Sequence, residues 1–212
     1  MNKISPFLFI TTLILFCFSL LGNVIFIYQI GEQNRSIRVV DGDSIDLKDG
    51  RRVRLLAIDA PERGRCLFEA GRKKLEEIVL NKRVKLEDAV VDDYGRLLAN
   101  VFVGRILVNK VLLEEGLARF VYVKSPYYEE LKQVSQLAKE QKRGIYSPLC
   151  RTPAKVDCLI KGNIRHGEKV YHLPSCDNYD QVIIDEAFGD QWFCTETEAV
   201  GSGFRKAAGC KN

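Results

Sequence analysis

The sequence predicts an α+β protein that is mainly β, and three features of its central part lead to this fold class. Five short apolar runs are separated by Asp-Gly, Lys-Asp-Gly and Asp-Tyr-Gly turns, as in a series of β-strands. One amphipathic helix is predicted within this series, and two more follow it. Five strands with one inserted helix and two later ones favour a small closed barrel, so we expect a five-stranded OB-type barrel with three helices.

The predicted strands cover residues 37–40, 44–47, 52–58, 83–91 and 97–103. The third strand is followed by Asp59, and Pro61 then turns the chain before Glu62. The strand end can therefore bring Arg54, Asp59 and Glu62 to one rim of the barrel. Two carboxylates placed together in this way need a positive charge between them.

Three helices are predicted around these strands. The first covers residues 67–80 and places Leu75, Ile78 and Val79 on one face. The second helix is expected to begin after Asn109 as its N-cap and to end at Gly116. The third begins at Ser125 and Pro126 and ends at Gly144.

The N-terminal segment is predicted to anchor the chain in a lipid bilayer. No charged residue occurs between Lys3 and Glu32, and the apolar stretch Phe7–Tyr28 would extend about 33 Å as a helix, enough to span a membrane. The stretch is long for a cleaved signal peptide, and no A-x-A-like site follows it. We expect a single transmembrane helix in residues 1–31; the alternative is a cleaved signal and a secreted protein.

The cysteines indicate an oxidising compartment. Cys17 lies in the apolar segment and is expected to pack there, and six more cysteines follow it, an even number that favours disulfides. The remainder of the chain is therefore expected on the periplasmic or extracellular side. Because four of the six belong to a small C-terminal module, we expect them to pair among themselves. The predicted pairs are Cys158 with Cys194, Cys176 with Cys210, and Cys66 with Cys150. The alternative is a zinc site with His172, Cys176, Cys194 and Cys210 as ligands.

The chain is predicted to contain an N-terminal anchor (1–31), an OB domain (35–148), a linker (149–157) and a small Cys-rich module (158–212). The linker region has two prolines and little periodicity between Ser147 and Cys158. The net charge of +4 permits a polyanionic partner without requiring one. No protein partner is inferred.

Three segments supply acidic and basic side chains that suit phosphodiester chemistry. Residues 39–47, 54–62 and 92–99 contain four acids and two arginines of interest: Asp41, Asp43, Asp59, Glu62, Arg54 and Arg96. Oxygen ligands without nearby His or Cys select Ca²⁺ or Mg²⁺ over Zn²⁺. Two guanidiniums can stabilise the charge of a phosphodiester transition state, and a carboxylate can orient or deprotonate the attacking water. Taken singly, each of these residues could equally be an ordinary solvated surface residue.

The order of these segments resembles the staphylococcal-nuclease-like, or thermonuclease, family. The motifs are D-G-D-S at 41–44, RLLAIDAPE at 54–62, D-D-Y-G-R at 92–96, VNKVLLEEGLARFVYV at 108–123 and RGIYS at 143–147. The resemblance implies an OB barrel and a Ca²⁺-dependent nuclease that hydrolyses DNA or RNA by metal-assisted water attack. The alternative is a nucleic-acid-binding OB protein without catalysis.

The resemblance also implies a role for each site residue. Asp43, Asp59 and the Ala60 carbonyl would be metal ligands, and Asp41 would lie beside them. Glu62 would act on the attacking water, and Arg54 and Arg96 would hold the phosphate. Tyr94 and Tyr122 match aromatic positions that flank the nucleotide, although half-buried core positions are an equal alternative for them. Ala60 stands where the family often has Thr, and the loop after Glu62 is short.

The C-terminal module resembles the sunset domain that follows some of these nucleases. The motifs are KGN at 161–163, YHLPSC at 171–176 and WFCTETEA at 192–199. That domain implies no established activity, so a structural or substrate-recruiting role is expected.

Overall fold

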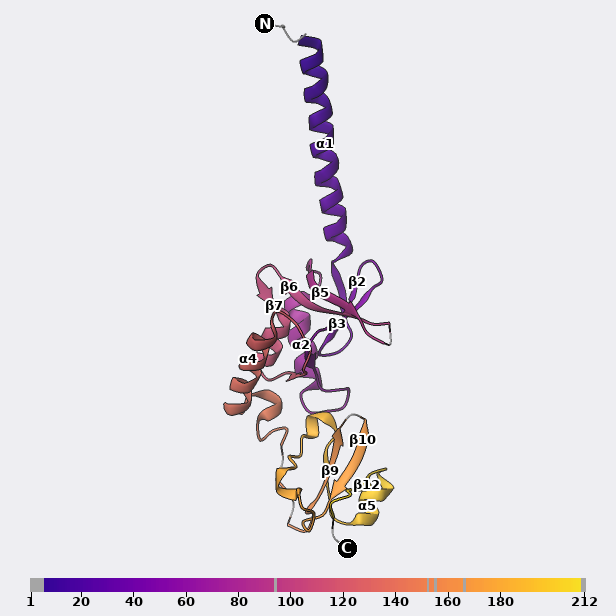
Figure 1. The fold of residues 1–212 in the computed structure, drawn as a ribbon, viewed down its shortest axis with the longest axis vertical. Coiled ribbons are helices and arrows are strands. Elements are labelled where there is room, and N and C mark those ends of the chain that lie inside the picture. Colours follow the sequence, from indigo (N-terminus) through magenta and orange to yellow (C-terminus); the bar gives the residue numbers. More distant parts are fainter. Residues whose placement is uncertain (1–5, 94, 152, 155, 166, 211–212) are drawn as a thin grey trace.

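The computed structural model describes residues 6–93, 95–151, 153–154, 156–165 and 167–210, apart from the side chains of residues 6–9 and 27–31. In Figure 1 the long helix α1 (Pro6–Gln33) leads away from the main sheet at one end, and the C-terminal strands lie at the other end. The mixed α+β class, mainly strands, is confirmed.

The main sheet has six strands and is open. Its members are β1 (Ser36–Val39), β2 (Ser44–Leu47), β3 (Arg52–Leu55), β5 (Lys85–Val91), β6 (Leu97–Val103) and β7 (Ile106–Leu107). The strand order is β1-β2-β3-β6-β5, and β7 also pairs with β6. Strands β3 and β6 run parallel, whereas the pairs β1–β2, β2–β3, β5–β6 and β6–β7 are antiparallel.

The closed barrel expected from the sequence is wrong. Among the described residues, the β1 and β5 ends of the sheet meet through the isolated bridge Arg35↔Arg83 rather than a ladder. β1 has four residues and a register shift between Ser36 and Arg38, which leaves little straight edge for pairing.

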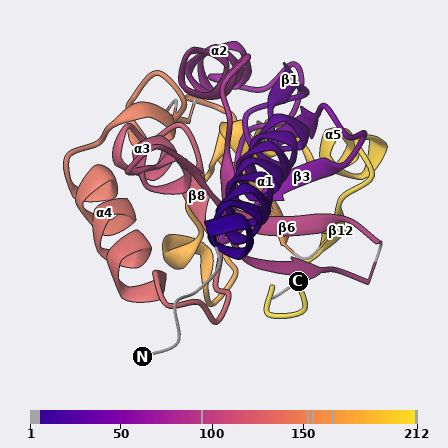
Figure 2. The same cartoon turned by 90° about the horizontal axis from the view of Figure 1, so that it is seen from above.

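Helices cover one side of this sheet. They are α2 (Phe68–Val79), α3 (Val108–Glu114) and α4 (Tyr128–Glu140), followed by the short 3₁₀-helix η1 (Gly144–Tyr146). Figure 2, seen along α1, shows α2, α3 and α4 to one side and β3 and β6 to the other. Their apolar faces bury Leu75, Val79, Leu112 and Leu131 in one core with strand residues such as Ile45 and Val53. The three helices predicted for this region are present.

Asn109 has a different role from the predicted helix cap. α3 begins at Val108, and Asn109 lies fully buried inside it. Its side-chain amide donates to the Leu56 carbonyl at 2.8 Å, and its oxygen accepts the Val101 backbone N–H at 2.9 Å. Asn109 therefore connects the turn after β3 with β6. This role depends on contacts between residues that are far apart in the sequence.

The third predicted strand is divided in two. β3 ends at Leu55, a turn covers Leu56 and Ala57, and β4 (Ile58–Asp59) then pairs antiparallel with β8 (Arg119–Phe120) in a separate two-stranded sheet. Ala57 has φ of 62°, a left-handed conformation that costs an L-residue about 1 kcal/mol. The turn is held because Leu56 and Ala57 hydrogen-bond to Ala99, Val121 and Asn109.

The C-terminal residues form a four-stranded sheet of order β11-β9-β10-β12. Its strands are β9 (Ile160–Arg165), β10 (Glu168–His172), β11 (Gln191–Phe193) and β12 (Arg205–Lys206). Two 3₁₀-helices, η2 (Tyr179–Gln181) and η3 (Glu186–Phe188), precede β11, and α5 (Glu196–Gly201) follows it. Thr195 caps α5 by accepting the Glu198 backbone N–H at 3.1 Å.

Three disulfides are present, Cys66–Cys150, Cys158–Cys194 and Cys176–Cys210, and they are the predicted pairs. The zinc alternative is wrong, because its three cysteines are in disulfides and His172 Nδ1 lies 3.2 Å from the Asn178 side-chain oxygen. Cys17 is free and exposed on α1.

Within the residues described, α1 does not provide a helix long and apolar enough to cross a membrane, and no other helix does. The predicted span Phe7–Tyr28 extends into residues whose side chains lie outside the described set. The anchor therefore stays a prediction.

Candidate active site

Arg54 and Asp43 meet because of the register of a hairpin. In the β2–β3 pair, Ser44 lies opposite Arg54, so the guanidinium is next to the residue that precedes β2. Arg54 Nη1 donates to Asp43 Oδ1 at 2.8 Å. Two residues that are eleven positions apart in the sequence are thus joined by strand pairing.

Asp59 reaches the same guanidinium because the chain bends. In one straight strand, residues 54 and 59 would be about 16 Å apart and on opposite faces. The turn at Leu56 and Ala57 removes that separation, and Arg54 Nη2 donates to Asp59 Oδ1 at 2.7 Å. Arg54 therefore bridges the two aspartates.

Asp43 is held in a buried environment with 2 % of its surface exposed. Its Oδ1 also accepts the Ser44 hydroxyl at 2.9 Å, and its Oδ2 accepts the Ala60 backbone N–H at 2.9 Å. Burial raises the pKa of Asp43 to about 7, and the Arg54 guanidinium opposes that rise. A further positive charge beside Asp43 would lower this pKa and favour the ionised carboxylate.

Arg119 belongs to the same cluster and was missed in the sequence. The β4–β8 register places Arg119 directly opposite Asp59. Arg119 Nε and Nη2 lie 3.0 and 2.8 Å from Asp59 Oδ2. The sequence does not reveal this role because β8 has only two residues and no alternating pattern marks it, so its pairing with β4 cannot be predicted.

We define the aspartate–arginine cluster as Asp43, Arg54, Asp59 and Arg119. Its carboxylates are hard oxygen donors that suit Ca²⁺ or Mg²⁺ in type. Arg54 lies between them and Arg119 pairs with Asp59, so the two guanidiniums together balance the two carboxylates. No group of three or more potential acidic, His or Cys ligands is found in the part of the chain that is described. The donor chemistry therefore fits a divalent cation, with two side chains supplying the oxygens.

The other predicted site residues are placed less closely together. Asp41 adjoins the cluster, because its Oδ1 accepts the Asp43 backbone N–H at 3.1 Å. Glu62 is exposed after the buried Pro61, and no hydrogen bond or ion pair links its side chain to the described cluster. Arg96 pairs with Asp92 at 2.7 Å near the β5–β6 turn. Tyr94 lies outside the described residues.

Tyr122 faces a cavity beside the cluster. It is 73 % exposed and makes an edge-on contact with Tyr128 at 5.3 Å between ring centroids, so the half-buried core alternative is wrong for it. The cavity has a volume of about 630 Å³ and is lined by Arg54, Asp59, Arg119 and Tyr122 on one side. Ile164, Arg165 and Phe188 of the C-terminal residues line the other side.

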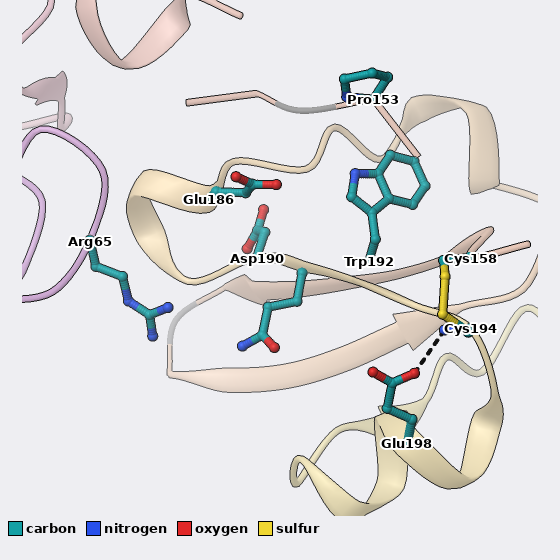
Figure 3. Close-up of a pocket in the computed structure, with 9 residues that line it drawn as sticks. Arg65, Pro153, Cys158, Glu186, Asp190, Trp192, Cys194 and Glu198 are labelled. Atoms are coloured by element: carbon teal, nitrogen blue, oxygen red, sulfur yellow. Dashed lines mark hydrogen bonds between the residues drawn. A yellow bond between two sulfur atoms is a disulfide. The ribbon is translucent and has the colours of Figure 1, made fainter. Parts of the chain in front are cut away.

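A second hollow, of about 540 Å³, lies in the C-terminal region and has the opposite chemistry (Figure 3). Glu186, Asp190 and Glu198 line it together with Trp192, and Arg65 reaches toward it from outside this region. Glu198 is already used in accepting the Cys194 backbone N–H at 2.9 Å. Three carboxylates against one guanidinium would repel a polyanion, so the cavity beside the aspartate–arginine cluster is the better candidate site.

The strand register thus brings two aspartates and two arginines together in one cluster beside a cavity. The family model described as staphylococcal nuclease homologue matches residues 52–148. The chain is 31 % identical over 133 residues to a micrococcal nuclease of Shigella flexneri, covering 56 % of this chain and 76 % of that protein. It is also 33 % identical to a thermonuclease of Staphylococcus hyicus, covering 52 % of this chain and 73 % of that protein. The chain therefore belongs to the staphylococcal nuclease family.

A further relative matches this chain over a smaller part of its own length. The SPbeta prophage-derived endonuclease YokF of Bacillus subtilis is 38 % identical over 125 residues, which is 52 % of this chain and 42 % of that protein. The matched family region ends before the C-terminal sheet, so the resemblance of residues 158–207 to the sunset domain stays a prediction.

Proposed function

We propose that this protein is a nuclease that hydrolyses phosphodiester bonds of DNA or RNA. The single observation that carries the proposal is Arg54, which bridges Asp43 and Asp59 beside an open cavity. The names of its relatives, a micrococcal nuclease, a thermonuclease and an endonuclease, support a nucleic acid as the substrate.

We propose Ca²⁺ as the cofactor, with the carboxylates of Asp43 and Asp59 as its side-chain ligands and the Ala60 carbonyl as a further ligand. A bound Ca²⁺ would supply positive charge that stabilises the phosphate in the transition state. Arg54 would then be free to turn from the carboxylates toward a phosphate oxygen, for which its planar guanidinium is suited. Asp41 would hold the loop of Asp43 through the backbone bond that it already makes.

Glu62 and Arg96 are proposed to join the site when substrate binds. Glu62 is exposed after Pro61, three residues beyond Asp59, and its carboxylate would orient or deprotonate the attacking water. Arg96 lies near a turn and would exchange its contact with Asp92 for one with a phosphate. Tyr122, which lines the cavity, is proposed to stack on a base.

The proposed location is an oxidising compartment outside the cytoplasm. The three disulfides support it, since such bonds persist where thiols are not kept reduced. We propose that residues 1–31 stay attached as a membrane anchor. N-terminal sequencing of the mature protein tests this, and a new N-terminus after about Gly22 would instead indicate a cleaved signal.

The test is cleavage of plasmid DNA and of RNA with Ca²⁺ titrated, and with a chelator. Glu62→Gln should lower kcat by about 10²-fold without changing the unfolding curve, because it removes a proton acceptor and little packing. Glu69→Gln, an exposed carboxylate on the first turn of α2, is the matched control and should keep full activity.

Two outcomes would contradict the proposal in different ways. Glu62→Gln with wild-type turnover would remove Glu62 from the reaction. A wild-type protein that binds DNA but cleaves neither DNA nor RNA at any Ca²⁺ concentration would favour the alternative, a binding protein without catalysis.

A further inference from the structure

The C-terminal residues pack directly against the region that carries the aspartate–arginine cluster. Ala187 of η3 is fully buried in a core with Ala138, Ile145 and Cys150. The Phe188 ring lies under the Arg119 guanidinium, with 3.7 Å from Arg119 Cζ to the ring centroid. Arg119 is therefore held between Asp59 and an aromatic ring that comes from the C-terminal region.

A second cavity adjoins the one at the candidate active site along this contact. The 630 Å³ cavity beside Asp59 shares Arg119, Phe120 and Arg165 with a neighbouring cavity of about 330 Å³. That second cavity is lined by Lys132 and Lys139 of α4 and, on the opposite wall, by Asp185. We call the two cavities together the α4 groove.

The charges along the α4 groove are mostly positive. Five cationic side chains line its second cavity, namely Arg119, Lys132, Lys139, Arg151 and Arg165. Three of them are matched by acids, since Arg119 pairs with Asp59, Arg151 with Asp185 at 3.4 Å and Arg165 with Asp190 at 3.3 Å. Among the described residues, Lys132 and Lys139 have no carboxylate partner within ion-pair distance, so the α4 side of the groove keeps two uncompensated charges.

Two buried polar atoms of the groove wall lack a protein partner. Arg151 Nε and Asp185 Oδ1 are both buried and make no hydrogen bond within the described residues. A buried donor and acceptor of this kind cost free energy unless water or a ligand satisfies them. The wall therefore contains hydrogen-bonding capacity that the protein itself does not use.

We propose that the α4 groove binds the sugar–phosphate backbone of the substrate strand at nucleotides beyond the cleaved bond, so that the C-terminal region forms one wall of the nucleic-acid-binding site. This proposal rests on the proposed nuclease function. Lys132 and Lys139 contact phosphates. Arg119 and Arg165 lie where the cavity beside the cluster adjoins the cavity along α4. Asp185, on the far wall, is buried and paired with Arg151, so the α4 side keeps the excess positive charge.

The test compares Lys132→Gln/Lys139→Gln with Lys73→Gln/Lys82→Gln, which removes two exposed lysines outside the groove. Binding of a 20-nucleotide single strand is measured in chelator, so that no cleavage is needed. The groove variant should bind about tenfold more weakly, and its slope of log Kd against log salt should fall by about 0.7 for each phosphate that a lysine no longer neutralises. The control should bind within about twofold of the wild type.

Cleavage then separates this proposal from the nuclease proposal. On the 20-nucleotide strand the groove variant should show a raised KM with kcat unchanged, whereas on a dinucleotide both variants should match the wild type. Equal binding of the two double variants would overturn the groove, whatever the catalytic result. Weaker binding by the groove variant in a protein that cleaves nothing would retain the groove and overturn the nuclease function.

Discussion

The region of residues 36–146 and the C-terminal region of residues 158–210 are stabilised in different ways. The first has one extended core of strand and helix residues, including fully buried Ile45, Leu75, Leu112 and Leu131. The second has a small core of Ile160, Tyr171, Phe193, Ala199 and Phe204, together with two disulfides. A region too small to bury much apolar surface is thus held by cross-links, which constrain its unfolded state.

The difference extends to the charged residues. In the first region Arg54 and Asp43 are ordered by strand register, and Asp43 is buried. In the C-terminal region the buried acids Asp185 and Asp190 face the first region or the neighbouring strand, and each is paired with a single arginine. The region with the large core therefore fixes several charged side chains in one cluster. The smaller region contributes charged side chains where it contacts the first region.

The largest expected effect is on the aspartate–arginine cluster. Arg54→Lys should reduce cleavage by about 10³-fold, because one ammonium cannot bridge Asp43 and Asp59 or hold a phosphate with two parallel bonds. The measurement is kcat/KM on single-stranded DNA. Arg52→Lys, two residues earlier on β3 and paired with Asp46 on the surface, is the control and should stay within about twofold. Near-normal activity of Arg54→Lys would reduce Arg54 to a structural ion pair.

The next effect concerns the cross-links. Cys158→Ser/Cys194→Ser should cost about 4 kcal/mol and expose the C-terminal region to protease, because its core is small. Cys66→Ser/Cys150→Ser removes a bond across a longer loop, yet the extended core should keep residues 36–146 folded. Limited proteolysis with peptide mapping locates the cuts. Cuts spread equally over both regions in both variants would contradict the comparison.

The smallest effect is a pH dependence at the contact between the two regions. Burial raises the pKa of Asp185, where Arg151, Arg119 and Asp190 face it. A carboxyl whose pKa is raised on folding adds stability below its ordinary value of about 4 and loses it as the pH rises through its folded-state pKa. The pKa of Asp46 is instead lowered by Arg52, so its contribution is lost on acidification below about 4.

Asp185→Asn separates these two contributions. Between pH 7 and pH 4.5 the wild type should gain stability from Asp185, and the variant should lack this gain, as measured by urea unfolding. Asn is close in shape, so its oxygen can still accept from Arg151. An unchanged pH slope in Asp185→Asn would show that this carboxyl titrates alike in the folded and unfolded states.

The sequence by itself determined the elements whose signals are local. Strands 44–47 and 97–103 occur with the predicted bounds, and the first predicted helix is shorter by one residue at each end. The grouping of the cysteines by region narrowed the disulfide pairs, and the places of Cys158 and Cys194 beside likely core strands selected the set that is present. Alternation, amphipathic spacing and turn residues act over a few positions, so these features can be deduced without knowing the fold.

The tertiary structure decided the geometry of the site. The turn at Leu56 and Ala57 has no Gly or Pro to announce it, and it exists because Asn109, Ala99 and Val121 hold its backbone from other elements. That turn sends Asp59 back to Arg54 and opposite Arg119. The open edge of the sheet and the packing of Phe188 on Arg119 likewise depend on partners far apart in the sequence. Long-range pairing set these features, because no local pattern encodes which distant segment a two-residue strand will meet.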